Sequence, residues 1–243
     1  FVFASELKAI LRDNSIKRDI DWQAIDLALS FRFISSPSTG FQNVKKLPAG
    51  HYLTWKSGNI EIHKYWDAGE IAVETKNENE WKKEVRNLFL DSVKGRMISD
   101  VPLGAFLSGG IDSTSVIAAM KEAGVKNIET FVISIGGKSE DQKYANLAAK
   151  YFGTNHHEIE LEKIDYQKAL EKLISHYDEP FFDQSALPSM LISEQMKKHV
   201  TVVLSGDGGD ELFGGYEAYK KIGALNIISK ISRGSGFRAL AKI

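Results

Sequence analysis

Two stretches of the chain decide its fold: VPLGAFLSGGIDS at residues 101–113 and VTVVLSGDGGDELFGG at residues 200–215. Each opens with mostly apolar or β-branched residues, passes through Leu-Ser-Gly, and ends in a turn rich in glycine and acidic side chains. This pattern is typical of a buried strand that runs into a loop and then into a helix.

The segments around these two stretches alternate between strand-like and helix-like patterns. We expect strands at residues 103–107, 129–135, 157–161 and 200–204, and helices at residues 81–97, 112–123, 141–152, 166–177 and 185–199. Short strands separated by helices of ten or more residues imply right-handed crossovers between parallel strands. The sequence therefore predicts an α/β fold, a doubly wound parallel sheet with helices on both faces.

The first part of the chain has a different character. Aromatic and β-branched residues at 51–55 and 60–66 flank Ser57 and Gly58, which predicts a β-hairpin. Apolar residues within 20–33 recur at helical spacing, which predicts a helix there. A polar, acidic stretch then separates this part from the alternating part. We expect three regions: a mixed α and β domain at residues 1–67, a linker at 68–80, and the α/β domain at 81–243.

Composition excludes several classes of function. With 31 Lys and Arg against 32 Asp and Glu, the 243-residue chain has a formal charge of −1 and no overall field to steer it to nucleic acid or anionic lipid. It contains no cysteine, which excludes disulfides, thiolate metal sites and cysteine nucleophiles within these residues. No run of about eighteen apolar residues is present, so we expect a soluble, cytoplasmic protein without nucleic-acid or membrane partners.

We expect the chemistry in the two glycine-rich loops. In a parallel sheet the carboxyl ends of the strands lie at one edge, and ligands collect there at a switch point in strand order. The first loop combines glycines, the hydroxyls of Ser108 and Ser113, and a helix start, which suit a phosphate or pyrophosphate. Asp112 fits such a site if Mg²⁺ lies between carboxylate and phosphate oxygens. The second loop supplies Asp207, Asp210 and Glu211 for the same ion or for a proton transfer.

Other chemical signals are weaker. Gly137-Lys138-Ser139 lacks the upstream glycine of a P-loop, and the chain has neither a G-x-S-x-G elbow nor an H-E-x-x-H helix. His156 and His157 are adjacent in a predicted strand, so their side chains point to opposite faces and we assign them no metal site. Asp178-Glu179 fits a pair of catalytic carboxylates about as well as a helix end before Pro180.

Taken together, these stretches resemble the glutamine-dependent asparagine synthetases, members of the PP-loop ATP pyrophosphatases. SDVPLGAFLSGGIDS (residues 99–113) is similar to their pyrophosphate loop, TFVISIG (130–136) to the strand beside the adenosine, and VVLSGDGGDELFGGY (202–216) to their second nucleotide loop. FASELKAI and KKLPAGHYLTW are similar to the end of the family's N-terminal glutaminase domain. Residues 1–67 are thereby identified as the remnant of an Ntn-type glutaminase-like domain.

The resemblance implies ATP-dependent amide synthesis from small-molecule substrates. The side-chain carboxylate of aspartate attacks the α-phosphate of ATP, pyrophosphate leaves, and ammonia from glutamine converts β-aspartyl-AMP into asparagine and AMP. The family pattern implies Mg²⁺ ligation by Asp112 and Asp210, and catalytic roles for Asp112 and Asp207. The nucleotide-binding residues implied by the resemblance are Phe106, Leu107, Ser108, Gly109, Gly110, Asp112, Ser113, Ile133, Ser205 and Gly206.

Some expectations concern what these residues lack. The family's glutaminase nucleophile is an N-terminal cysteine, the chain begins with Phe1, and the family's synthetase domain continues beyond residue 243, so we expect a fragment that is inactive alone. Three functions stay open: an asparagine synthetase or an amidotransferase acting on another carboxylate, for example in surface polysaccharide assembly; a PP-loop enzyme of another reaction, such as β-lactam formation or tRNA thiolation; and a non-catalytic nucleotide-binding module. A homodimeric assembly is also left open.

Overall fold

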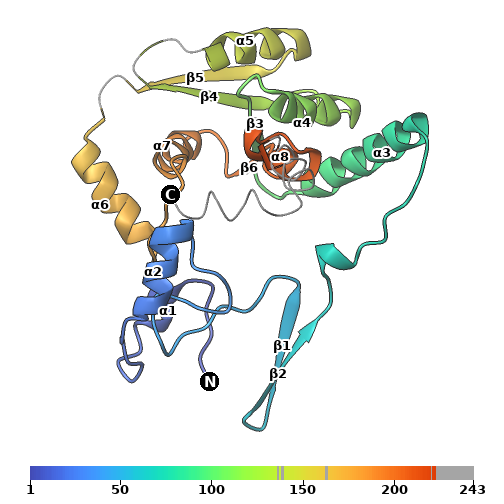
Figure 1. Ribbon diagram of the computed structural model, residues 1–243. Helices are drawn as coiled ribbons and strands as arrows, with labels where there is room; N and C mark the ends of the chain where they lie inside the picture. Colours follow the sequence, from blue (N-terminus) through green and yellow to red (C-terminus); the bar gives the residue numbers. More distant parts are fainter. Residues whose placement is uncertain (136, 138–139, 162–163, 220, 223–243) are drawn as a thin grey trace, which may run out of the picture. The chain divides into compact units, whose positions relative to one another are not determined.

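The computed structural model describes residues 1–135, 137, 140–161, 164–219 and 221–222 (Figure 1). Lys138, Ser139 and the end of the predicted 81–243 domain, from residue 223, lie outside the described residues. The helices are α1 (Leu7–Ile10), α2 (Trp22–Phe31), the 3₁₀ turn η1 (Ala68–Glu70), α3 (Glu78–Arg96), α4 (Ile111–Glu122), α5 (Glu140–Phe152), α6 (Tyr166–His176), α7 (Ala186–Met196) and α8 (Gly209–Phe213). The strands are β1 (His51–Lys56), β2 (Asn59–Lys64), β3 (Leu103–Phe106), β4 (Glu129–Ile135), β5 (Asn155–Leu161) and β6 (Val202–Leu204).

The chain divides into two compact units. The first contains residues 1–83 and 163–195, and the second contains residues 84–162 and 196–243. A unit thus combines segments that are far apart in the sequence. Among the helices of the described ranges, none combines the length and apolar character needed to cross a bilayer.

The first unit contains the predicted hairpin and helix. Strands β1 and β2 pair antiparallel, with His51 opposite Lys64 and Lys56 opposite Asn59. Ser57 at φ 52° and Gly58 at φ 86° both adopt the left-handed backbone that a two-residue hairpin turn requires. Helix α2 begins after Asp21, whose carboxylate accepts a hydrogen bond from the Ala24 N–H at 3.0 Å. The predicted hairpin and the helix predicted within residues 20–33 are therefore confirmed.

The second unit is built on a four-stranded parallel sheet with the order β5-β4-β3-β6. The chain moves outward from β3 to β4 and β5, and then returns to add β6 on the other side of β3. This reversal places a switch point between β3 and β6. The predicted parallel α/β fold is confirmed.

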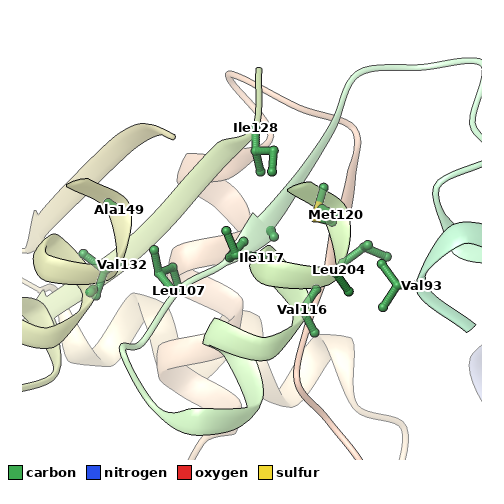
Figure 2. Packing of buried hydrophobic residues seen from close by; sticks show 12 residues of the cluster. Val93, Leu107, Val116, Ile117, Met120, Ile128, Val132, Ala149 and Leu204 are labelled. Carbon is green, nitrogen blue, oxygen red and sulfur yellow. The ribbon is translucent and has the colours of Figure 1, made fainter. Parts of the chain in front are cut away.

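Helices α4 and α5 pack against one face of this sheet and against each other (Figure 1). Their apolar side chains share one core with the strands, in which Leu107 and Ile117 are fully buried (Figure 2). Burial of such a side chain stabilises the fold by about 1.5–3 kcal/mol relative to exposure. On the opposite face, the Phe131 ring is also buried and stacks on the imidazole of His157. Both faces of strand β4, the neighbour of β3, are therefore covered by buried side chains. The first loop, which follows β3, is thus held by a well-packed sheet.

Two features of the fold were not predicted. The short helix α8 follows the second glycine-rich loop, and the 3₁₀ turn η1 lies within the predicted linker. The predicted strand at 157–161 begins two residues earlier, at Asn155. The last predicted strand begins two residues later, at Val202. The elements that carry the two loops nonetheless have the predicted type and order.

Candidate nucleotide site at the carboxyl edge of the sheet

The two glycine-rich loops follow neighbouring strands. Strands β3 and β6 pair in parallel, with Ala105 opposite Leu204, so both strands end at the same edge of the sheet. The loop of residues 107–113, here called the first loop, follows β3, and the loop of residues 205–209, called the second loop, follows β6. Both therefore lie at the switch point, where ligands bind in open α/β sheets.

The first loop is shaped by hydrogen bonds between its two hydroxyls. Ser113, which is 7% exposed, places its Oγ 3.0 Å from the Oγ of Ser108 and accepts the Ser108 N–H at 3.2 Å. Gly109 has a φ of 79°, and a Cβ at this position would lie 2.5 Å from the backbone nitrogen of Ala145. Only glycine combines this backbone with so close an approach of helix α5. The first loop therefore turns tightly into helix α4.

The start of helix α4 offers N–H groups to a ligand. Its N-cap residue is Gly110, which has no side chain to accept a hydrogen bond from the first turn. The first N–H groups of a helix have no partner within the helix, and together with the helix dipole they attract anions. The geometry of the first loop thus suits a phosphate or pyrophosphate group.

The second loop packs directly on Asp112 of the first loop. A Cβ added to Gly209 would lie 2.5 Å from the Asp112 Cγ, and one added to Gly206 would lie 2.9 Å from the backbone nitrogen of Ser113. Glycine at both positions lets the two loops touch. The structure therefore brings the start of helix α4 and the second loop into contact, as the sequence predicted, although the two loops are nearly one hundred positions apart.

The acidic side chains of the second loop and of helix α8 after it are not equivalent. The Asp207 carboxylate accepts a hydrogen bond from the Ser205 hydroxyl at 2.9 Å. Glu211 accepts one from the Tyr216 hydroxyl at 2.7 Å. This hydrogen bond is the largest cause of two pKa shifts, because it lowers the pKa of Glu211 and raises the pKa of Tyr216 to about 12. The Tyr216–Glu211 pair was not anticipated, since nothing in the sequence distinguishes its geometry from that of other exposed side chains.

Two carboxylates of these segments have no side-chain partner among the described residues. Within the part of the chain that the structure describes, Asp112 and Asp210 accept no side-chain hydrogen bond and form no ion pair. The described residues also include no group of three or more His, Asp or Glu side chains able to hold a metal ion by themselves. Mg²⁺ commonly uses one or two carboxylates together with phosphate oxygens and water. The donor set of Asp112 and Asp210 fits that use, with a nucleotide supplying further oxygens.

The edge of strand β4 is open beside the first loop. Strand β3 pairs with β4 only as far as Phe131, whose carbonyl accepts the Leu107 N–H at 2.9 Å, whereas β4 continues to Ile135. Backbone groups alternate sides along a strand, so the N–H and C=O of Ile133 point to the same side as those of Phe131. No described residue pairs with Ile133 on that side. A flat heterocycle with hydrogen-bonding edges could occupy this position beside Phe106 and Leu107.

Two weaker sequence signals have structural explanations. The side chains of His156 and His157 point to opposite faces of the sheet, where they contact Thr130 and Glu129, respectively. The pKa of His156 is lowered by burial. Asp178 and Glu179 belong to the other compact unit, where both carboxylates pair with lysine side chains. Helix α6 ends at His176, so the pair follows a helix end before Pro180, as the second interpretation predicted.

The fold and the two loops define an α/β protein with paired glycine-acid loops at the switch point of a parallel sheet. Residues 84–235 match the family model described as asparagine synthase, and residues 1–66 match the one described as glutamine amidotransferase domain. The chain belongs to the asparagine synthase family.

Two curated relatives agree with this assignment. The chain is 39% identical over 238 residues to a putative glutamine-hydrolysing asparagine synthetase 2 of Methanocaldococcus jannaschii, covering 96% of this chain and 46% of that protein. It is 37% identical to glutamine-hydrolysing asparagine synthetase 1 of Bacillus subtilis, covering 96% of this chain and 37% of that protein. Among solved structures, NMN synthetase from Francisella tularensis is 18% identical with a TM-score of 0.38, over 58% of this chain and 59% of that chain. The chain spans less than half the length of the two curated relatives.

Proposed function

We propose that the full-length protein is a glutamine-dependent ligase that converts aspartate and ATP into asparagine, AMP and pyrophosphate. Family membership and the two matched models support this proposal. The observation that carries it is the packing of Gly206 and Gly209 on the Asp112 region, because it gathers both loops at one edge of the sheet. A site assembled from two glycine-acid loops suits a nucleotide with its charged phosphates.

The first step is adenylylation of the substrate carboxylate. A carboxylate oxygen of aspartate bonds to the α-phosphorus of ATP, the bond from that phosphorus to the β-phosphate bridging oxygen breaks, and pyrophosphate leaves with the electron pair. The first loop, with Ser108, Gly109, Gly110 and Ser113, binds the leaving pyrophosphate through hydroxyls and through the uncapped first turn of helix α4. Because these donors are already fixed, they stabilise the developing charge without reorganisation.

Asp112 and Asp210 would hold Mg²⁺ at the contact between the loops. When bound, this ion neutralises negative charge on the phosphate oxygens. Asp112 would belong to the catalytic machinery through that contact. Its carboxylate is held beside Gly209, and it accepts no hydrogen bond from the described residues that would compete with a cation.

The adenine would lie at the open edge of β4. There the backbone of Ile133 would offer an N–H and a C=O to the heterocycle, while Phe106 and Leu107 end the neighbouring strand. Ser205 and Gly206, at the end of β6, would lie along the nucleotide. The two ends of the nucleotide are thereby assigned to two different strand ends of one sheet.

The second step is attack by ammonia on the acyl carbon of β-aspartyl-AMP. A carbon–nitrogen bond forms, the carbon–oxygen bond to AMP breaks, and the nitrogen loses a proton. Asp207 is exposed at the second loop and is oriented by the Ser205 hydroxyl at 2.9 Å, so we assign it the role of accepting that proton.

Exchange of labelled pyrophosphate into ATP by the full-length protein tests the proposal. With Mg²⁺, aspartate should stimulate the exchange, and adding ammonia or glutamine should yield asparagine and AMP. Exchange that requires a different carboxylate would replace aspartate as the acceptor. Binding of ATP without any exchange, over a panel of carboxylates, would contradict the proposal and support a non-catalytic nucleotide-binding module.

A further inference from the structure

Asp178 and Glu179 connect segments that match two different family models. Both residues follow helix α6, within the stretch matching asparagine synthase, and they contact residues within the stretch matching the glutamine amidotransferase domain. Both contacts lie inside one compact unit, which combines residues 1–83 with 163–195. The side chains are only 15% and 16% exposed, so these are not ordinary surface charges.

Asp178 binds the start of helix α1. Its Oδ2 accepts the Lys8 N–H at 3.0 Å, and its Oδ1 lies 3.3 Å from the Lys8 Nζ. The same Nζ donates to the carbonyl of His176 at 2.7 Å. Lys8 is therefore held by its backbone and by its side chain, both against the end of helix α6.

Glu179 binds a loop whose shape is fixed by its own hydrogen bonds. The Thr39 hydroxyl lies 2.9 Å from both the Phe41 and the Val44 carbonyls, and Thr39 is buried. Glu179 accepts the Gly40 N–H at 2.6 Å through Oε1, and its Oε2 lies 2.6 Å from the Lys46 Nζ. Each carboxylate oxygen thus has its own donor on the opposite segment.

An apolar contact accompanies these polar ones. Phe182, three residues after Glu179, packs against the small core formed by Ala24, Ala28 and Ile34. Charge pairs that are partly removed from water and backed by apolar packing resist separation more than exposed pairs do. Together the contacts fix the α6–α7 connection onto the first segment of the chain.

We propose that Asp178 and Glu179 are positioning residues that hold the amidotransferase-like segment against the synthetase-like segment, so that ammonia released from glutamine is used for amide synthesis rather than lost. This inference rests on the proposed function. Neither residue touches the reacting atoms; each acts by keeping the two segments in register. Loss of the contact should therefore affect the transfer of nitrogen between the two reactions, and should leave each reaction by itself intact.

The experiment uses the full-length protein and the adjacent lysines 45 and 46. Lys46 pairs with Glu179, whereas Lys45 is exposed and forms no ion pair with a described residue. The measured quantity is the ratio of asparagine formed to glutamate formed with glutamine as the nitrogen donor. In Lys46→Met and Glu179→Gln the ratio should fall at least about threefold, because each variant leaves a partly buried charge or donor unpaired.

The controls separate positioning from a general structural effect. Lys45→Met should keep the wild-type ratio, Lys46→Arg should restore most of it, and synthesis from added ammonia should stay within about twofold of wild type in all variants. An unchanged ratio in both Lys46→Met and Glu179→Gln overturns the inference. Equal loss of ammonia-dependent and glutamine-dependent synthesis also overturns it, since that indicates a general structural defect.

Amide hydrogen exchange distinguishes failure of this inference from failure of the proposed function. If the wild-type protein makes no amide from either nitrogen source, the proposed function fails. The contact can still be tested, since the Gly40 N–H, which loses its acceptor in Glu179→Ala, should exchange at least about tenfold faster in that variant than in wild type or in Lys45→Met. Unchanged exchange at Gly40 would contradict the contact itself.

Discussion

Two pairs of acidic residues in this protein have opposite surroundings. The carboxylates of Asp178 and Glu179 accept hydrogen bonds from backbone N–H groups and form ion pairs with lysine side chains. Asp112 and Asp210 lie beside glycines, and no described side chain donates to them. A carboxylate that the fold already satisfies contributes to structure, whereas one left without a donor beside an anion-binding loop is available to a cation. The comparison separates carboxylates that stabilise the fold from carboxylates that are available to bind a ligand.

The largest expected effect is that of Asp112→Asn. The amide has lost the charge that binds the cation, so pyrophosphate exchange by the full-length protein should fall about 100-fold or more. The midpoint of thermal unfolding should change little, because no described side chain depends on this carboxylate. Exchange rate and unfolding midpoint, measured on the same sample, check this prediction. Activity near the wild-type level would refute the metal assignment.

The next largest effect is expected for Gly209→Ala. The added methyl group would lie 2.5 Å from the Asp112 Cγ, and the carboxylate can relieve this contact only by rotating away from its position. We expect exchange activity to fall about 10-fold or more, with folding retained, because a misplaced catalytic group costs rate rather than stability. Gly95→Ala is the matched control. A Cβ at Gly95 meets no atom within 4 Å, so alanine there should leave activity unchanged.

The sequence predicted which loops form the candidate site, because each of these loops directly follows a recognisable strand. The Leu-Ser-Gly stretches predicted two strands followed by loops, and the observed β3 and β6 are adjacent. Strand adjacency itself is not encoded in local pattern; it depends on the packing of helices over the sheet. The contact of Gly209 with Asp112 could not be predicted from the sequence either, because a run of glycines does not specify which of them contacts a side chain.

The acidic pair 178–179 shows the converse limit. The sequence predicted that the pair lies at a helix end, since Pro180 follows it. The choice between a catalytic and a structural role, however, depends on partners more than one hundred residues away. Lys8 and Lys46 look like ordinary surface lysines in the sequence. Long-range ion pairs have no periodic signature, so only the structure could decide between the two interpretations.

A smaller effect, on stability, is expected from substituting Asp178, whose carboxylate already has partners in the fold. In Asp178→Asn the Lys8 ammonium keeps Glu6 but loses its charge pairing with residue 178, where one oxygen is replaced by an NH₂ group that cannot accept a hydrogen bond. We expect a loss of about 1–2 kcal/mol of stability, or roughly 2–8 °C in the unfolding midpoint of the full-length protein. Ammonia-dependent synthesis should persist. Asp26→Asn, at an exposed carboxylate without a described side-chain partner, is the control and should leave the midpoint unchanged.

The smallest expected effect concerns Glu129, a carboxylate with intermediate surroundings. Partial burial by itself raises the pKa of Glu129, but hydrogen bonds from Asn155 and His157 outweigh it and hold that pKa below its ordinary value of 4.5. A group whose pKa is lower in the folded state stabilises the fold above its unfolded pKa, and this contribution is lost as the pH falls from 4.5 through the folded pKa. Unfolding of wild type and Glu129→Gln should therefore be compared from neutral pH to below this range.

The difference in unfolding free energy between the two proteins should shrink as the pH falls. Because the Glu129 pair is partly open to solvent, the pH-dependent part should amount to at most about 1 kcal/mol. A difference that stayed constant over this pH range would contradict a stabilising role for the ionised Glu129 carboxylate.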